Sequence, residues 1–238
     1  MFEKLSLLWK NEAPLTQEYK EFDEMLQLDL QMFRRITEAM LKGEDLRPLE
    51  NEIYETDVKV NKLERKIRKA LVTHLAVTEG ADVASSLVLM SIVKDAERMG
   101  DYCKNLYELS ECTSGPITGF QFFATIQDLI RHVTEVFENT IKAFDTEDSV
   151  LAAEIVADEV RWNKRFDKTI RDLARATLPT DEAVTSALLV RMMKRQQAHL
   201  SNITSTIIQP VHRIDHRPKH LRDNAAKTPS GEDGEDIS

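Results

Sequence analysis

The chain has 238 residues, a formal net charge of −9, 7 glycines and 7 prolines. This length suffices for one large domain or two small ones, and so few glycines and prolines are typical of a helix-rich protein. The acidic balance argues against binding to nucleic acid, whose backbone requires a basic surface. The 2 cysteines are too few for a disulfide framework, so we expect a reduced, cytoplasmic setting.

The apolar stretches of the sequence are too short for direct membrane insertion. The most apolar one, residues 84–93, has about half of the roughly 20 residues that a membrane-spanning helix needs. We also expect no targeting segment in residues 1–14, because they contain no long apolar run and no cleavage site. A membrane role would therefore come through a partner protein.

Apolar residues recur at spacings of three and four, which predicts an all-α fold. We expect Gly43 to end the first helix, Asp45 to cap the second with Pro48 in its first turn, and Asp82 to cap the third. No stretch alternates like a strand with β-branched enrichment, so no strand is expected. The six long helices are expected over residues 14–42, 45–78, 82–111, 118–144, 148–177 and 180–208.

The second half of the chain repeats the first. Residues 42–45, at the first helix junction, align with residues 145–148 at the corresponding later junction. Along the second and third helices of each half, the aligned pairs are Asp57 with Glu159, Asn61 with Asn163, Glu97 with Lys194, Asp101 with Ala198 and Asn105 with Asn202. We therefore predict a tandem of two three-helix bundles.

This repeat divides the chain into two domains with flanking segments. The second domain is degenerate, because its third helix has lost both carboxylates. The end of the chain is polar and highly charged, so we expect it to be disordered. The predicted segments are an N-terminal extension at 1–13, a first three-helix bundle at 14–112, a second, degenerate bundle at 118–208 and a charged tail at 209–238.

Oxygen-bearing side chains line up on the second and third expected helices. Glu97, Asp101 and Asn105 are four residues apart, as are Asp57 and Asn61, so each set shares one helix face. Carboxylate and amide oxygens are the ligands that hard and intermediate divalent cations prefer. The sequence predicts a metal site formed by Asp57, Asn61, Glu97 and Asp101, with weaker candidates at Glu64, Asn105, Glu159 and Asn163.

Gly100 lies between the two acids of the third helix. A glycine inside a helix costs about 1 kcal/mol relative to alanine, so we expect another backbone to come close there. The alternative for the acids is a solvated face, on which Glu97 pairs with Lys94 or Arg98. In the second half, Lys194 stands where a carboxylate is needed and repels a cation, so we expect that site to be weak or empty.

The sequence contains no recognisable catalytic motif. It has no nucleophile with a matching base, no glycine-rich phosphate loop and no Glu-x-x-His motif of the di-iron bundles. We therefore predict that the chain is not an enzyme. The alternatives are a structural interaction bundle without metal and, less favoured, a carboxylate-metal enzyme or metal-storage protein.

Residues 97–101, ERMGD, followed by Asn105, resemble the ERIGD…N signature of PhoU-type phosphate-regulatory proteins. Asp57, Asn61 and Glu64 are similar to the second-helix motif of the same family. The resemblance implies a PhoU-like fold, in which two three-helix bundles are related by a pseudo-two-fold axis. It also implies a homodimer.

The resemblance spans residues 14–208 and is more specific in the first half. Some members of the family carry iron, zinc or nickel clusters, which points to Asp57, Glu97 and Asp101, with Asn61 in place of the second acid of its motif. The family role implies negative regulation of phosphate uptake and of the phosphate-starvation response. The implied partners are a phosphate transporter subunit and/or a sensor histidine kinase at the inner membrane face.

Overall fold

The structure is a computed structural model that describes residues 15–79, 82–113 and 115–209. The predicted N-terminal extension, and all but the first residue of the predicted tail, lie outside these ranges. Every regular element within them is helical, as predicted. The α-helices are α2 (Thr16–Lys42), α3 (Glu50–Val77), α4 (Val83–Glu108), α5 (Phe123–Thr146), α6 (Ser149–Arg175) and α7 (Thr180–Ile208).

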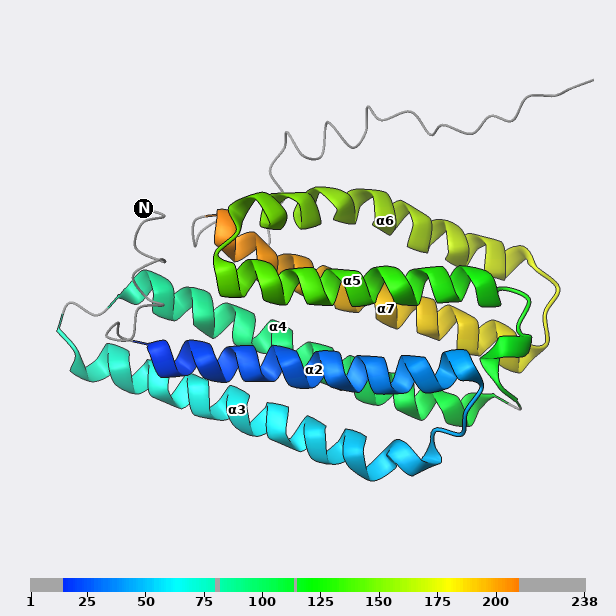
Figure 1. The fold of residues 1–238 in the computed structure, drawn as a ribbon, viewed down its shortest axis with the longest axis horizontal. Coiled ribbons are helices and arrows are strands. Elements are labelled where there is room, and N and C mark those ends of the chain that lie inside the picture. The colour runs from blue at the N-terminus through cyan, green and yellow to red at the C-terminus, as the bar shows by residue number, and fades with distance from the viewer. Residues whose placement is uncertain (1–14, 80–81, 114, 210–238) are drawn as a thin grey trace, which may run out of the picture.

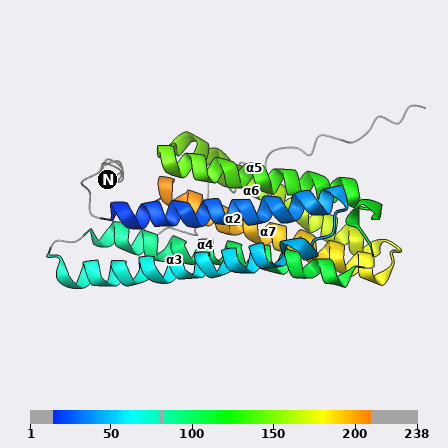
Figure 2. The same cartoon turned by 60° about the horizontal axis from the view of Figure 1, so that its bottom comes forward.

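The helices run along one long axis and form two three-helix units (Figure 1). Helices α2, α3 and α4 pack on one another, and so do α5, α6 and α7. The units meet where α4 packs on α7 and α2 packs on α5 (Figure 2). Helices α3 and α6 lie at the two outer edges of the bundle in Figure 1. The predicted tandem of two three-helix bundles is therefore confirmed. Among the described helices, none is long and apolar enough to cross a membrane.

The two units share one hydrophobic core, because their buried apolar residues form a single continuous cluster. Phe33 of α2 stacks on Phe137 of α5 with ring centroids 5.5 Å apart. Phe22 and Phe144 meet across the same contact at 5.1 Å. Aromatic side chains of this size contribute much of the apolar burial that stabilises a fold, at about 25 cal/mol per Å². The first unit is thus anchored along its length to the second.

Local sequence signals predict several helix ends correctly. Gly43 ends α2 in the left-handed conformation, with φ of 70°. Asp82 caps α4 by accepting a hydrogen bond from the backbone N–H of Ser85 at 3.2 Å. Asp148 caps α6 in the same way, accepting from Val150 and Leu151 at 3.0 Å each. Each carboxylate satisfies backbone donors that the first helical turn leaves free.

The second helix begins later than predicted. A 3₁₀ turn, Arg47–Leu49, comes first, with Leu46 as its N-cap residue. Asp45 accepts a hydrogen bond from the backbone N–H of Arg47 at 3.0 Å. Pro48 lies inside this turn, and α3 starts only at Glu50. The prediction that Asp45 caps the second helix is therefore wrong, because the 3₁₀ turn separates it from α3 and the N-cap residue of α3 is Leu49.

The fourth helix also starts later than residue 118. A 3₁₀ turn at Ile117–Gly119 comes first, and α5 begins at Phe123. Pro116 and Phe120, on either side of the turn, are both extended with ψ of 143°. An extended residue cannot continue a helix, so the turn stays separate from α5.

Helices α2 and α5 end with the same backbone conformation. Gly43 ends α2 with φ of 70°, and Glu147 ends α5 with φ of 51°. The backbone N–H of each cap donates to carbonyl oxygens in the last turn of its helix. Gly43 therefore corresponds to Glu147, and the predicted alignment with Thr146 is wrong by one residue.

Candidate functional site

The predicted carboxylates of α3 and α4 face one another across a lysine. The ammonium Nζ of Lys104 lies 3.4 Å from Asp57 Oδ2 on α3 and 3.4 Å from Asp101 Oδ1 on its own helix. Burial disfavours the charged form of Lys104, but the charges of Asp57 and Asp101 outweigh it and raise the pKa of the ammonium. The two acids thus share one cation supplied by the chain.

A further carboxylate, missed by the sequence analysis, completes this cluster. Asp29 of α2 is 0% exposed, and within the described part of the chain neither of its oxygens has a hydrogen-bond partner. Burial first, and then the charges of Asp57, Glu97 and Asp101, raise the pKa of Asp29 well above its ordinary range. These four acids, Asp29, Asp57, Glu97 and Asp101, are hereafter the acidic centre.

Gly100 provides the space for Asp29. A Cβ atom at Gly100 would lie 3.0 Å from Asp29 Oδ1 and 3.4 Å from Val60 Cγ1. The expectation that another backbone comes close to Gly100 is therefore wrong. Side chains of α2 and α3 approach it instead, because both helices pack against α4 at this level.

A signal for Asp29 exists in the sequence. It lies three residues after Leu26 and four before Phe33, so it shares the apolar face of its helix. An acid in the middle of an apolar stripe is rarely buried without a reason. Asp29 has no oxygen-bearing side chain four residues away on its own helix, because the acids near it in space come from α3 and α4.

The remaining first-half candidates have local partners. Lys94 Nζ lies 2.6 Å from Glu97 Oε2, and Arg98 Nε lies 4.0 Å from the same atom. The neighbourhood ion pair expected as an alternative for Glu97 is therefore present. The amide of Asn61 donates to the backbone oxygen of Asp57 at 3.0 Å, within its own helix.

The weaker candidates add little to the centre. Glu64 pairs with Arg68 at 2.9 Å, and Asn105 is half-buried on α4. In the ranges that the structure describes, no group of three or more His, Cys, Asp or Glu side chains is placed to hold a metal ion. Asp29 adds a buried carboxylate whose oxygens have no hydrogen-bond partner in the described residues, but Lys94, Arg98 and Lys104 already pair with the other three acids. The metal site therefore stays a prediction.

The corresponding region of the second unit holds a hydrogen-bonded polar network. The two carboxylate oxygens of Glu159 accept from Asn163 Nδ2 at 3.0 Å and from Ser201 Oγ at 2.7 Å. Lys194, which replaces the first acid of α4, pairs with Asp167 of α6. The carboxylate of Glu159 thus accepts hydrogen bonds from other side chains. The carboxylate of Asp29 accepts none from the described residues.

Two substitutions explain this difference. Gln197 takes the place of Gly100, and its Oε1 lies 2.6 Å from Nε2 of the buried His132. When α2 and α5 are aligned on their C-cap residues, Gly43 and Glu147, Asp29 corresponds to Val133, which is fully buried. The second unit therefore has a side chain where the first has a glycine, and an apolar group where the first has an acid.

A polar contact joins α4 to the second unit close to the acidic centre. His199 Nδ1 of α7 lies 2.7 Å from Asp95 Oδ1 of α4, and Asn202 Nδ2 donates to the same oxygen at 3.2 Å. Arg195 Nε donates to the hydroxyl of Tyr102 at 3.2 Å. The helix that carries Glu97 and Asp101 is thus fastened to α7 by side chains on both sides of those acids.

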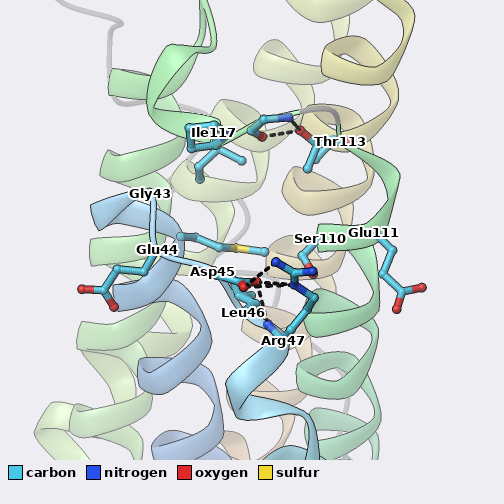
Figure 3. Close-up of a pocket in the computed structure, with 13 residues that line it drawn as sticks. Gly43, Glu44, Asp45, Leu46, Arg47, Ser110, Glu111, Thr113 and Ile117 are labelled. Carbon is cyan, nitrogen blue, oxygen red and sulfur yellow. Dashed lines mark hydrogen bonds and ion pairs between the residues drawn. The ribbon is translucent and has the colours of Figure 1, made fainter.

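A cavity of about 450 Å³ lies elsewhere, at one end of the bundle (Figure 3). The junction between α2 and α3 and the segment after α4 form most of its wall, and Asp45 pairs there with Arg47 at 2.8 Å. Thr185 of α7 completes the lining. No residue of the acidic centre or of the predicted metal site is among the described residues that line it.

Residues 22–110 match the family model of the PhoU domain. This stretch of the chain is similar to PhoU domains. The matched range contains all four acids of the acidic centre and ends two residues before the predicted boundary of the first bundle at 112. The resemblance of this chain to PhoU-type proteins is therefore confirmed.

Two further similarities extend beyond the PhoU domain. A phosphate-specific transport system accessory protein PhoU homolog of Aquifex aeolicus (strain VF5) is 22% identical over 189 residues, covering 74% of this chain and 83% of the relative. A crystal structure of PhoU from Pseudomonas aeruginosa superposes with a TM-score of 0.71 at 18% identity. That match covers 82% of this chain and 95% of the other, so the fold similarity includes both three-helix units.

Proposed function

We propose that this chain regulates phosphate uptake and the phosphate-starvation response, by binding and not by catalysis. The observation that carries the proposal is the PhoU domain over residues 22–110, which encloses the acidic centre. The name of the Aquifex relative, an accessory protein of a phosphate-specific transport system, supports the same role. The proposed partners are a phosphate transporter subunit and/or a sensor histidine kinase at the inner membrane face, bound by a cytoplasmic homodimer.

The proposal includes a metal ion in the acidic centre. Asp57, Glu97 and Asp101 are the proposed ligands, with Asn61 as a neutral donor and Asp29 as a buried carboxylate behind them. Iron, zinc or nickel would add positive charge to that of Lys94 and Lys104, which already pair with these acids. Elemental mass spectrometry of untagged protein, purified without chelator, measures the metal content directly.

The role in phosphate regulation is tested by deleting the gene in its own organism. We expect phosphate uptake to rise in phosphate-replete medium and the wild-type gene to restore it. A variant with Glu97→Gln and Asp101→Asn is expected to restore it poorly. The matched control is Glu135→Gln with Glu138→Gln, which removes two exposed acids from α5. Unchanged phosphate uptake after deletion would overturn the proposal.

One observation favours a second candidate, an interaction bundle without metal. Lys94 pairs with Glu97, and Lys104 bridges Asp57 and Asp101, so protein cations already neutralise part of the centre. This candidate predicts metal-free protein that still restores phosphate regulation. By contrast, metal-dependent ferroxidase or phosphatase turnover that Glu97→Ala abolishes would indicate a carboxylate-metal enzyme.

A further inference from the structure

We propose that the cavity at the end of the bundle binds a small zwitterion, an α-amino acid with an apolar side chain. Its volume of about 450 Å³ has room for a molecule of that size. The inference goes beyond the proposed function and does not depend on it. It is also separate from the acidic centre, no residue of which is among the described residues that line the cavity.

The first step is that the cavity is lined by residues for which the second unit has no counterpart. Residues 44–49 lie between the C-cap of α2 and the start of α3, and residues 44–47 line the cavity. In the second unit, Asp148 alone lies between the C-cap of α5 and the start of α6. The additional residues are therefore not needed to join two helices of such a unit, and connecting segments of this kind often carry binding residues.

The second step is a buried hydroxyl group in the lining. Thr185 is 1% exposed, and its Oγ1 has no hydrogen-bond partner in the described residues. A buried hydroxyl without a hydrogen bond is unfavourable, so a ligand that donates to it or accepts from it gains affinity. The buried side chains of Met40, Leu46 and Ile117 lie in the same lining and offer an apolar surface to the rest of the ligand.

The third step is the ion pair of Asp45 and Arg47, which lies in the lining (Figure 3). Arg47 Nη2 is 2.8 Å from Asp45 Oδ2, and the two side chains are 87% and 50% exposed. An exposed ion pair contributes little to stability, so it opens at small cost. The carboxylate of an amino acid then pairs with Arg47 and its ammonium with Asp45. A ligand with a single charge would leave one of the two protein groups without an opposite charge.

The other charges of the lining argue against an anionic ligand. Glu44 and Glu111 are exposed, and Figure 3 shows their side chains pointing away from the cavity on opposite sides. They add negative potential around the cavity without reaching into it. That potential repels an anion, whereas a zwitterion has no net charge to be repelled.

The test is isothermal titration calorimetry of the full-length protein with L-leucine. Two analogues separate the charges of leucine, because 4-methylpentanoate lacks the ammonium and 3-methylbutylamine lacks the carboxylate. We expect L-leucine to bind with a Kd of about 1 mM or tighter, and each analogue to bind at least about tenfold more weakly.

Arg47→Met and Asp45→Asn should each weaken leucine binding about tenfold or more, because one charge of the ligand loses its partner. The matched control is Arg161→Met. Arg161 also forms an exposed ion pair, with Asp158 at 2.9 Å, but it does not line the cavity. We expect this variant to bind leucine as the wild type does. Arg47→Gln replaces Arg47→Met if the apolar variant loses its helical circular dichroism.

Thr185→Val tests the buried hydroxyl separately. We expect leucine to bind about three- to tenfold more weakly to this variant, since one hydrogen bond to the ligand is lost. Without leucine, its melting temperature should equal or exceed that of the wild type, because the described residues give the hydroxyl no hydrogen bond to lose.

Three results would overturn the inference. The first is no binding of L-leucine to the wild type, and the second is equal binding of leucine and either analogue. The third is equal leucine affinity of the wild type and the Arg47 variant. Phosphate uptake after gene deletion is measured independently, so failure of this inference and failure of the proposed function are distinguishable.

Discussion

At the scale of single residues, Asp29 is an unusual side chain for a protein interior. It is fully buried, surrounded by other acids and without a hydrogen-bond partner in the part of the chain described. A buried carboxyl with a raised pKa binds its proton more tightly in the folded state than in the unfolded state. The folded protein therefore loses stability as pH rises from the ordinary carboxyl range through the raised pKa of Asp29.

Asp29→Asn should remove this loss. The amide has the same shape and no charge, so the stability of the variant relative to the wild type should increase with pH and reach about 1 kcal/mol or more near neutrality. Urea unfolding of metal-free protein between pH 4 and pH 8 measures the difference. Asp172→Asn, at an exposed acid paired with Lys168, is the control and should stay within about 0.5 kcal/mol. Parallel pH profiles for Asp29→Asn and the wild type would contradict this account.

His132 has the opposite pH dependence. It stacks on Trp162 with ring centroids 3.6 Å apart, and burial lowers its pKa to about 4. Between its ordinary value of 6.5 and about 4, the unfolded state binds the extra proton and the folded state does not, so stability falls as pH drops through this window.

His132→Phe should keep the stacking and lose this acid sensitivity. We expect the wild type to lose up to about 3 kcal/mol more than the variant between pH 7 and pH 4, in urea unfolding experiments. Neutral-pH stability of the variant will reflect the lost contact with Gln197 and is a separate quantity. An equal loss in both proteins would show that another group causes the acid sensitivity.

At the scale of elements, α2 and α5 both end at a residue in the left-handed conformation, but the residue type differs between the two units. Gly43 takes the left-handed conformation at no steric cost, and a Cβ there would also lie 3.2 Å from Pro116 Cβ. Glu147 takes it with a side chain, at φ of 51°. Left-handed backbone costs an ordinary residue about 1–2 kcal/mol.

Substitutions at the two caps should therefore have opposite signs. Gly43→Ala should lower the free energy of unfolding by about 1 kcal/mol or more, through strain and the contact with Pro116. Glu147→Gly should raise it by a few tenths up to about 1 kcal/mol, because relief of strain exceeds the added entropy of the unfolded chain. Chemical denaturation of both variants measures the two changes, and the same sign for both would be inconsistent with equivalent caps.

At the scale of the whole molecule, the acidic centre is tied to the second unit through α4. Asp95 of α4 binds His199 of α7 at 2.7 Å, two residues before Glu97. Both side chains are largely buried, so this contact should be stronger than an exposed ion pair. A change in the position of α4 at the acidic centre would therefore alter the contact between Asp95 and His199 of α7.

A double-mutant cycle with Asp95→Asn and His199→Gln should give a coupling energy of about 1 kcal/mol. The control is the exposed pair of Arg34 on α2 and Glu138 on α5, which also joins the two units. Its coupling should be no more than about 0.5 kcal/mol. A coupling near zero for Asp95 and His199 would mean that the apolar core alone holds the units together.

The sequence by itself determined the helical class, the tandem repeat, most helix ends and the facing acids of α3 and α4. These features depend on residue spacing and on capping residues, which act within one or two turns of a helix. The PhoU resemblance rested on the same kind of local pattern, in residues 97–101 with Asn105 and in Asp57, Asn61 and Glu64.

Only the tertiary structure decided which groups share the acidic centre. Asp29 reaches it from α2, and Gly100 proves to accommodate that carboxylate and not a backbone. Lys104 lies between acids of two helices, a contact that its sequence position does not reveal. The physical reason is that burial and charge at this site come from three helices at once, and packing between helices sets distances that residue spacing along one helix does not encode.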